Sequence, residues 1–289
     1  MTDLWELLIQ PLRYPFMVRG LLASVMVGTL CAVVGTYVVL RGMAFLGDAL
    51  AHAILPGIAA AYLMQINLIW GALVMGLLTA FGIGYVSRQG EVKEDTAIGV
   101  IFAGSLALGV AMLSTVRNYT VDLTHILFGD VLGVSPTDLW LTAGFGILVL
   151  LVVFLLYKEL LVVSFDPILA ATLRLPLRAL QYLLLVLIAL TIVVSLQTVG
   201  VALMVAMLVT PAATAYLLTR RLWHMMLVGA AIGALSSVTG LYLSFYVNVA
   251  SGAAVVLVCT ALFVLAFFFA PGRGVLWSWL RRRDRRQPA

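Results

Sequence analysis

Apolar runs of about 20 residues recur along this chain, and they constrain its fold more than any other feature. About 20 apolar residues are what an α-helix needs to cross the hydrocarbon core of a bilayer, which is about 30 Å thick. Inside that core every backbone N–H and C=O group must be bonded within the protein, so a spanning segment is a helix or part of a closed barrel. A barrel would need segments of about 10 residues that alternate in polarity. The sequence therefore predicts an all-α, polytopic helical membrane protein.

The runs predict nine transmembrane helices. A count of eight stays open, because the boundaries of the shorter runs are weak. In the second run the pair Pro56-Gly57 predicts a kink. We treat residues 1–289 as a single transmembrane domain with an interfacial helix over 1–15, a polar stretch over 158–178 and a basic tail over 271–289. The expected spans are approximately 17–40, 48–64, 68–86, 96–116, 139–157, 179–196, 200–219, 222–247 and 252–270.

Charge composition and placement agree with this class of protein. Only 10% of the residues are charged, compared with about 25% in soluble domains. The net charge of +5 does not indicate nucleic-acid binding, because the arginines at 281–286 follow the last apolar run without aromatic residues for base stacking. Nine spans place 14 of the 17 basic residues on the side of this tail. Since basic residues gather on the cytoplasmic side and meet anionic lipid there, we expect the tail and the 158–178 stretch inside and the N-terminus outside.

Residues 41–53 place a carboxylate and an imidazole within an apolar region. Asp48 and His52 are four residues apart, so a helix puts them one turn apart on the same face. An aspartate oxygen and an imidazole nitrogen suit Mn²⁺, Zn²⁺ and Fe²⁺. A charge at membrane depth costs about 2.5–3.5 kcal/mol and usually marks a pathway. Two ligands do not close a site, so a second copy, another segment or water must complete it. The alternative is structural, with Asp48 as an N-cap or first-turn residue and His52 as a satisfied interior histidine.

Two stretches outside the spans have their own patterns. Residues 164–173 predict a short helix, with Asp166 as its cap and Pro167 at its first position. The alanines and leucines that follow form a compact apolar knob, which suits docking to a soluble partner, although an ordinary connector is the alternative. Residues 117–138 are too polar to span and too apolar for a free loop, so we expect a short surface or re-entrant helix there.

Five motifs in this order resemble the permease subunits of bacterial manganese, zinc and iron ABC transporters, the ABC-3 family. The resemblance covers nearly the whole chain. The family often has glycine at the position of Arg174 and an acidic residue at that of Ile168, and this chain departs from it at both. The motifs are residues 41–53, Leu127-Phe128-Gly129 with Val134-Ser135, Phe165-Asp166-Pro167 with Ala170, residues 200–215, and Gly240-Leu241 with Ser251-Gly252.

The resemblance implies a transmembrane domain like that of type II ABC importers, in the bacterial cytoplasmic (inner) membrane, working as a homodimer by alternating access. It implies that Asp48 and His52 contact the transported divalent metal, and that an extracytoplasmic metal-binding protein delivers it. A separate cytoplasmic ABC ATPase would dock on the short helix. The residues implied in that coupling are Phe165, Asp166, Pro167, Leu169, Ala170 and Leu173.

Further expectations concern chemistry. The chain has no Walker-type glycine-rich loop, so ATP hydrolysis falls to a partner, and we expect neither catalytic residues nor a permanently bound cofactor. A gradient-driven carrier or channel for divalent cations would use the same Asp48 and His52, but proton relays usually need several intramembrane acids. An intramembrane metalloenzyme would need a third ligand and a general base, such as a His-Glu-x-x-His pattern, which the sequence lacks.

Overall fold

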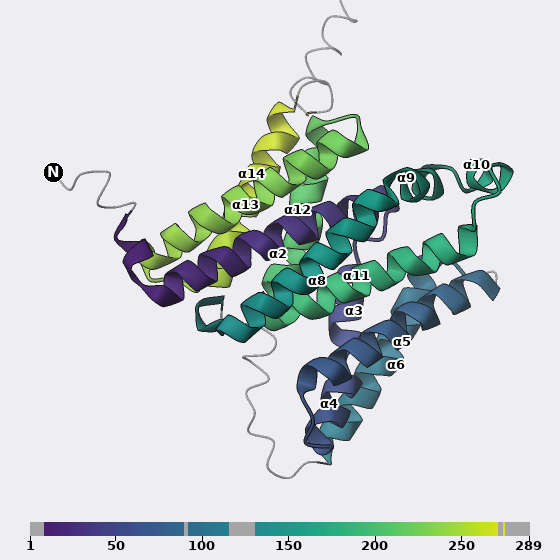
Figure 1. Ribbon diagram of the computed structural model, residues 1–289, viewed down its shortest axis with the longest axis horizontal. Helices are drawn as coiled ribbons and strands as arrows, with labels where there is room; N and C mark the ends of the chain where they lie inside the picture. Colours follow the sequence, from purple (N-terminus) through teal and green to yellow (C-terminus); the bar gives the residue numbers. More distant parts are fainter. Residues whose placement is uncertain (1–8, 90–91, 116–130, 271–273, 275–289) are drawn as a thin grey trace, which may run out of the picture.

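The computed structural model describes residues 9–89, 92–115, 131–270 and 274, and every regular element in that part is a helix (Figure 1). Nine helical stretches among these residues are long and apolar enough to cross a membrane, which confirms the count of nine rather than eight. They are α2 (Pro15–Leu40), α3 with α4 (Leu46–Ala53 and Leu55–Leu63), α5 (Leu68–Gln89), α6 (Glu94–Ser114), α8 (Pro136–Leu155), α11 (Leu177–Val199), α12 (Val201–Leu218), α13 (Leu222–Val247) and α14 (Ser251–Phe269).

Helix α2 lies at the centre of the larger of two helix groups (Figure 1). It packs against α8, α11, α12 and α13, while α14 packs against α12 and α13. Two glycines of α2 allow close approach of its neighbours. A Cβ at Gly28 would lie 3.0 Å from the carbonyl oxygen of Gly233 on α13, and a Cβ at Gly35 would collide with the carbonyl of Leu208 on α12. Small residues at such contacts let helix backbones pack closely in a membrane.

The smaller group consists of α4, α5 and α6, which pack against one another. Gly57 of α4 faces Gly71 of α5, and a Cβ at either position would collide with the carbonyl of the other. Helix α11 joins the two groups by packing on α5. Helix α3 lies between them, against α5, α6, α11 and α12 (Figure 1). The predicted metal-contact residues are therefore on a short helix at the junction of the two groups.

The second span is broken, as the pair Pro56-Gly57 predicts, but the break precedes the proline. Helix α3 ends at Ala53 and α4 begins at Leu55. Proline has no N–H group, and its ring clashes with the carbonyl four residues earlier, which here belongs to His52. That carbonyl accepts a hydrogen bond from the N–H of Ile54 instead. The break thus falls at Ile54, and it ends α3 one residue after His52.

The stretch 158–178 is mostly helical. It contains the end of α9 (Tyr157–Phe165) and all of α10 (Pro167–Thr172), and Figure 1 shows α10 at one end of the molecule. The carboxylate of Asp166 accepts hydrogen bonds from the N–H groups of Ile168 (3.0 Å) and Leu169 (2.9 Å), which confirms the predicted cap. Arg174 follows α10 with a φ of 55°, in the left-handed region. Glycine adopts that conformation at little cost, so Arg174 occupies a backbone position that favours glycine.

Three predicted segments lie largely outside the described residues. They are the interfacial helix over 1–15, the surface helix over 117–138 and the basic tail over 271–289. Within the described residues, the first has the short 3₁₀ helix η1 (Pro11–Arg13) and the second has η2 (Val131–Gly133). The motif Leu127-Phe128-Gly129 also lies outside the described residues.

Candidate metal site

Asp48 and His52 lie on one face of α3, and the opposite face anchors the helix in the protein. Leu46, Ala49 and Leu50 are buried, each no more than 1% exposed. The side chains of Asp48 and His52 are 39% and 27% exposed. Asp48 and His52 are four residues apart and therefore share one face of the helix, while the apolar residues occupy the buried face. The polar face is thus held by a rigid element and is open on one side.

The two side chains already point toward each other. The Nε2 atom of His52 lies 3.5 Å from the Oδ1 atom of Asp48. Two donor atoms that bind one tetrahedral ion at about 2.1 Å lie about 3.4 Å apart. A first-row divalent ion could therefore be held between Oδ1 and Nε2 without movement of α3. The distance is compatible with both atoms binding one ion, so we refer to the pair as the candidate half-site.

Aromatic side chains border this half-site. The ring of Phe102, on α6, lies with its centroid 6.1 Å from that of the His52 imidazole. Phe102 also contacts Phe45 edge to face, with centroids 5.9 Å apart. On the far side of α3, a Cβ at Gly47 would lie 2.7 Å from a methyl group of Leu208, so α3 and α12 are in close contact. The imidazole thus has an aromatic neighbour on α6, while the carboxylate of Asp48 stays partly exposed.

The ligand set of one chain is incomplete. Across the described ranges, no group of three or more His, Cys, Asp or Glu side chains could hold a metal ion. The structural alternative for Asp48 is correct in part. The N-cap of α3 is Phe45, so Asp48 does not cap the helix, but it lies in the first turn, where its charge complements the helix dipole. This placement is compatible with metal contact by the outward-facing oxygen atoms.

His224 is the other histidine among the described residues. His224 is exposed in the first turn of α13, which agrees with an interfacial, solvated residue. His125 lies outside the described residues.

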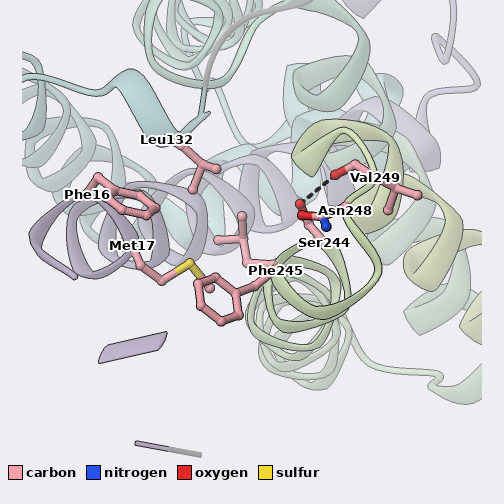
Figure 2. A pocket seen from close by; sticks show the side chains of 8 residues that line it. Phe16, Met17, Leu132, Ser244, Phe245, Asn248 and Val249 are labelled. Carbon is pink, nitrogen blue, oxygen red and sulfur yellow. Dashed lines mark hydrogen bonds between the residues drawn. The ribbon is translucent and has the colours of Figure 1, made fainter. Parts of the chain in front are cut away.

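A cavity of about 510 Å³ lies between the start of α2, η2 and the turn from α13 to α14 (Figure 2). Two residues that line it are joined by a hydrogen bond of 2.7 Å, which the Ser244 hydroxyl donates to the carbonyl of Val249. Neither a carboxylate nor an imidazole lines it, so it does not offer a metal these ligands. The lining side chains are Phe16, Met17, Leu132, Leu241, Ser244, Phe245, Asn248 and Val249.

The predicted docking helix α10 presents an apolar surface. Phe165, Leu169 and Leu173 are 59%, 47% and 57% exposed. Ala170, by contrast, is buried with Val163 and Leu180, and so fixes α10 to α9 and α11. Sequence reasoning did not include Ile168 in this surface, although at 79% it is the most exposed of these side chains. Its position next to Phe165-Asp166-Pro167 was the signal that could have identified it.

Comparison with known proteins agrees with this architecture. The model of the ABC 3 transport family matches residues 13–270. The manganese transport system membrane protein MntC of Halalkalibacterium halodurans is 48% identical over 281 residues, which cover 97% of this chain and 96% of that protein. The manganese import system permease protein ScaB of Streptococcus parasanguinis is 44% identical over 259 residues, covering 90% of this chain and 92% of that protein.

A solved structure, PsaBC from Streptococcus pneumoniae in complex with Fab, has the same fold. It matches with a TM-score of 0.83 and 39% sequence identity, over 96% of this chain and 99% of that one. The family model covers most of the chain, and the relatives are similar over nearly their whole length. This multi-pass membrane protein therefore belongs to the ABC 3 transport family.

Proposed function

We propose that this chain is the permease subunit of an ATP-driven importer of a divalent transition metal, with manganese as the transported ion. Two copies form the translocation path between them and work by alternating access. Separate cytoplasmic subunits hydrolyse ATP, and an extracytoplasmic protein delivers the ion. Membership of the ABC 3 family and similarity to proteins named for manganese transport support this proposal.

The observation that carries the proposal is the half-site formed by Asp48 and His52. Its donor atoms are 3.5 Å apart and partly exposed on a helix that is otherwise buried. Two copies of the chain that meet at this face supply two carboxylates and two imidazoles, which is enough for a four-ligand site. The face that one chain leaves open is then the route of the ion.

Transport requires that this site release its ion as readily as it binds it. Only a difference in affinity between two states moves an equilibrium. A half-site from each subunit satisfies this requirement, because a small relative movement of the two subunits changes how many ligands reach the ion. The carboxylate oxygens of Asp48 suit manganese, whereas thiolates favour softer ions. The thiol of Cys31 is not part of the proposed site, because Cys31 is buried on α2, where its sulfur lies 3.4 Å from the Ser195 hydroxyl.

Helix α10 supplies the connection to the ATPase. It lies at one end of the molecule (Figure 1), which the basic residues predict to be cytoplasmic, and its side chains Ile168 and Leu169 are exposed. Exposed apolar patches of this kind mark protein–protein contacts. The cap by Asp166 stabilises α10, and the burial of Ala170 packs it against α9 and α11. Movement of the ATPase subunits can thus reach the membrane helices through it.

A manganese-uptake assay tests the proposal. The chain is expressed with its ATPase and binding protein in cells that lack their own manganese importer. We expect Asp48→Ala and His52→Ala each to abolish uptake while the complex still assembles. Asp95→Ala and His224→Ala are matched controls, because both residues are exposed and lie on other helices, and they should leave uptake unchanged. Normal uptake by both the Asp48 and the His52 variants would refute the proposed site.

The energy source is tested in inverted membrane vesicles of the same cells. Manganese export from the lumen, which corresponds to import into the cell, should require ATP and should persist when an uncoupler removes the ion gradients. Movement that continues without ATP and stops with the uncoupler would indicate a gradient-driven carrier instead.

A further inference from the structure

A second, smaller cavity lies at the cytoplasmic end of the molecule and is separate from the metal site. It has a volume of about 150 Å³. Its walls come from elements far apart in the sequence, namely the end of α2 at Leu40, the end of α9 at Phe165, and the connection from α12 to α13. That connection contributes Arg220 and Arg221, and Met225 of α13 also lines the cavity.

Two cationic side chains line the cavity. Arg220 and Arg221 are both exposed, and neither forms an ion pair with a carboxylate among the described residues. Helix α13 adds to this charge. Its N-cap is Arg221, with no side-chain cap and no acidic residue in the first turn, so the positive end of the helix dipole is not compensated locally. Two guanidinium groups and this helix start together favour an anion.

The surface around the cavity is apolar and aromatic. Tyr216, on the cavity wall, is 43% exposed and Trp223 is 44% exposed. The Trp223 ring contacts those of Phe154 and Tyr157 edge to face, with centroids 5.7 Å and 6.2 Å apart. Tyrosine and tryptophan gather at the level of the lipid headgroups in membrane proteins. Leu227, one turn from Trp223, is 52% exposed. An anion that also has apolar chains would contact the arginines through its charge and the surrounding apolar side chains through those chains.

We propose that this cavity binds the phosphate headgroup of an anionic phospholipid of the cytoplasmic leaflet. Arginine is suited to this because its planar guanidinium group donates two parallel hydrogen bonds to a phosphate. The buried side chains of Leu222 and Met225 lie at the apolar side of the cavity, and the acyl chains extend along the exposed face of α13. The bound lipid also contacts Phe165, which directly precedes the cap of α10.

Lipid binding to the purified permease tests this proposal. The protein in detergent is titrated with dioleoylphosphatidylglycerol or with dioleoylphosphatidylcholine, and bound lipid is counted by native mass spectrometry. We expect the wild type to prefer the anionic lipid, and Arg220→Gln with Arg221→Gln to weaken its binding about tenfold or more per arginine. The matched control is Arg174→Gln, because Arg174 is also an exposed arginine near the cytoplasmic end but does not line the cavity. It should keep the preference.

The proposal fails if the double glutamine variant binds phosphatidylglycerol as the wild type does. It also fails if millimolar inorganic phosphate displaces the lipid completely, since the site would then recognise free phosphate. If the variant keeps lipid binding and instead loses affinity for the ATPase, the arginines face that partner and the proposal is wrong. Thermal unfolding in phosphatidylcholine checks that the variant is folded. The variant with both arginines changed to lysine, which keeps the charge, should retain part of the preference.

Discussion

Truncation of the apolar side chains of α10 should weaken binding of the ATPase by an amount that follows from their exposure. Leu169 and Leu173 are 47% and 57% exposed, so together they present about the area of one whole leucine. Complete burial of a leucine side chain contributes about 1.5–3 kcal/mol. If both are buried in the complex, Leu169→Ala with Leu173→Ala should weaken the affinity between about 10-fold and about 150-fold.

The affinity can be measured by titrating the labelled ATPase subunit into permease held in nanodiscs. Leu63→Ala with Leu148→Ala is the matched control, because each of these leucines is 50% exposed and both lie on other helices. That variant should bind the ATPase like the wild type. Changing Leu169 and Leu173 to aspartate should abolish binding, since two charges would be buried without partners. Unaltered affinity of the double alanine variant would refute the assignment of α10 as the docking helix.

Three further substitutions and one control test packing and backbone conformation through the midpoint of thermal unfolding in detergent. Gly71→Ala places a methyl group against the carbonyl of Gly57, so it should lower the free energy of unfolding by about 1–3 kcal/mol. The control is Gly99→Ala, whose Cβ would meet nothing within 4 Å and which should leave the midpoint unchanged. Gly200 joins α11 to α12 with a φ of 82° and a ψ of 170°, a region essentially restricted to glycine, so Gly200→Ala should cost about 1–3 kcal/mol. Arg174→Gly should raise the midpoint, because it relieves a left-handed backbone strain of about 1 kcal/mol, and a lower midpoint would contradict this.

The spans were predictable because hydropathy is a local property. Every predicted span end lies within three residues of the corresponding helix end in the structure. The cap of α10 was predictable for a similar reason, since Asp166 bonds to N–H groups only two and three residues further along the chain. The position of the break in the second span was predicted less accurately, at Pro56-Gly57 instead of Ile54. The proline that causes it acts on a carbonyl four residues earlier, so the helix ends before the proline itself.

The surroundings of the candidate metal site could not be predicted from the sequence. The spacing of Asp48 and His52 indicates a shared helix face but does not say what covers it. Phe102, which borders the imidazole, lies on α6, and Leu208, against which α3 is packed, lies on α12. Contacts between helices so distant in sequence depend on how the spans pack, and apolar helices in lipid carry little amphipathic signal to show it.

The same limit applies to the cavity lined by Arg220 and Arg221. From the sequence, Arg220 and Arg221 indicated only which side of the membrane their loop occupies. In the structure, Leu40 and Phe165 lie against the same cavity, although they are far away in the chain. The proposed lipid site depends on this convergence of three segments, which the sequence alone does not show.

The most direct test of the central claim is pulsed electron paramagnetic resonance of Mn²⁺ bound to the assembled transporter. The chain has three histidines, and our account assigns only His52 to the ion. We predict a ¹⁴N coupling from imidazole in the wild type that disappears in His52→Gln and persists in His224→Gln. A nitrogen coupling that survives in His52→Gln would show that the ion is held elsewhere, and would contradict the account.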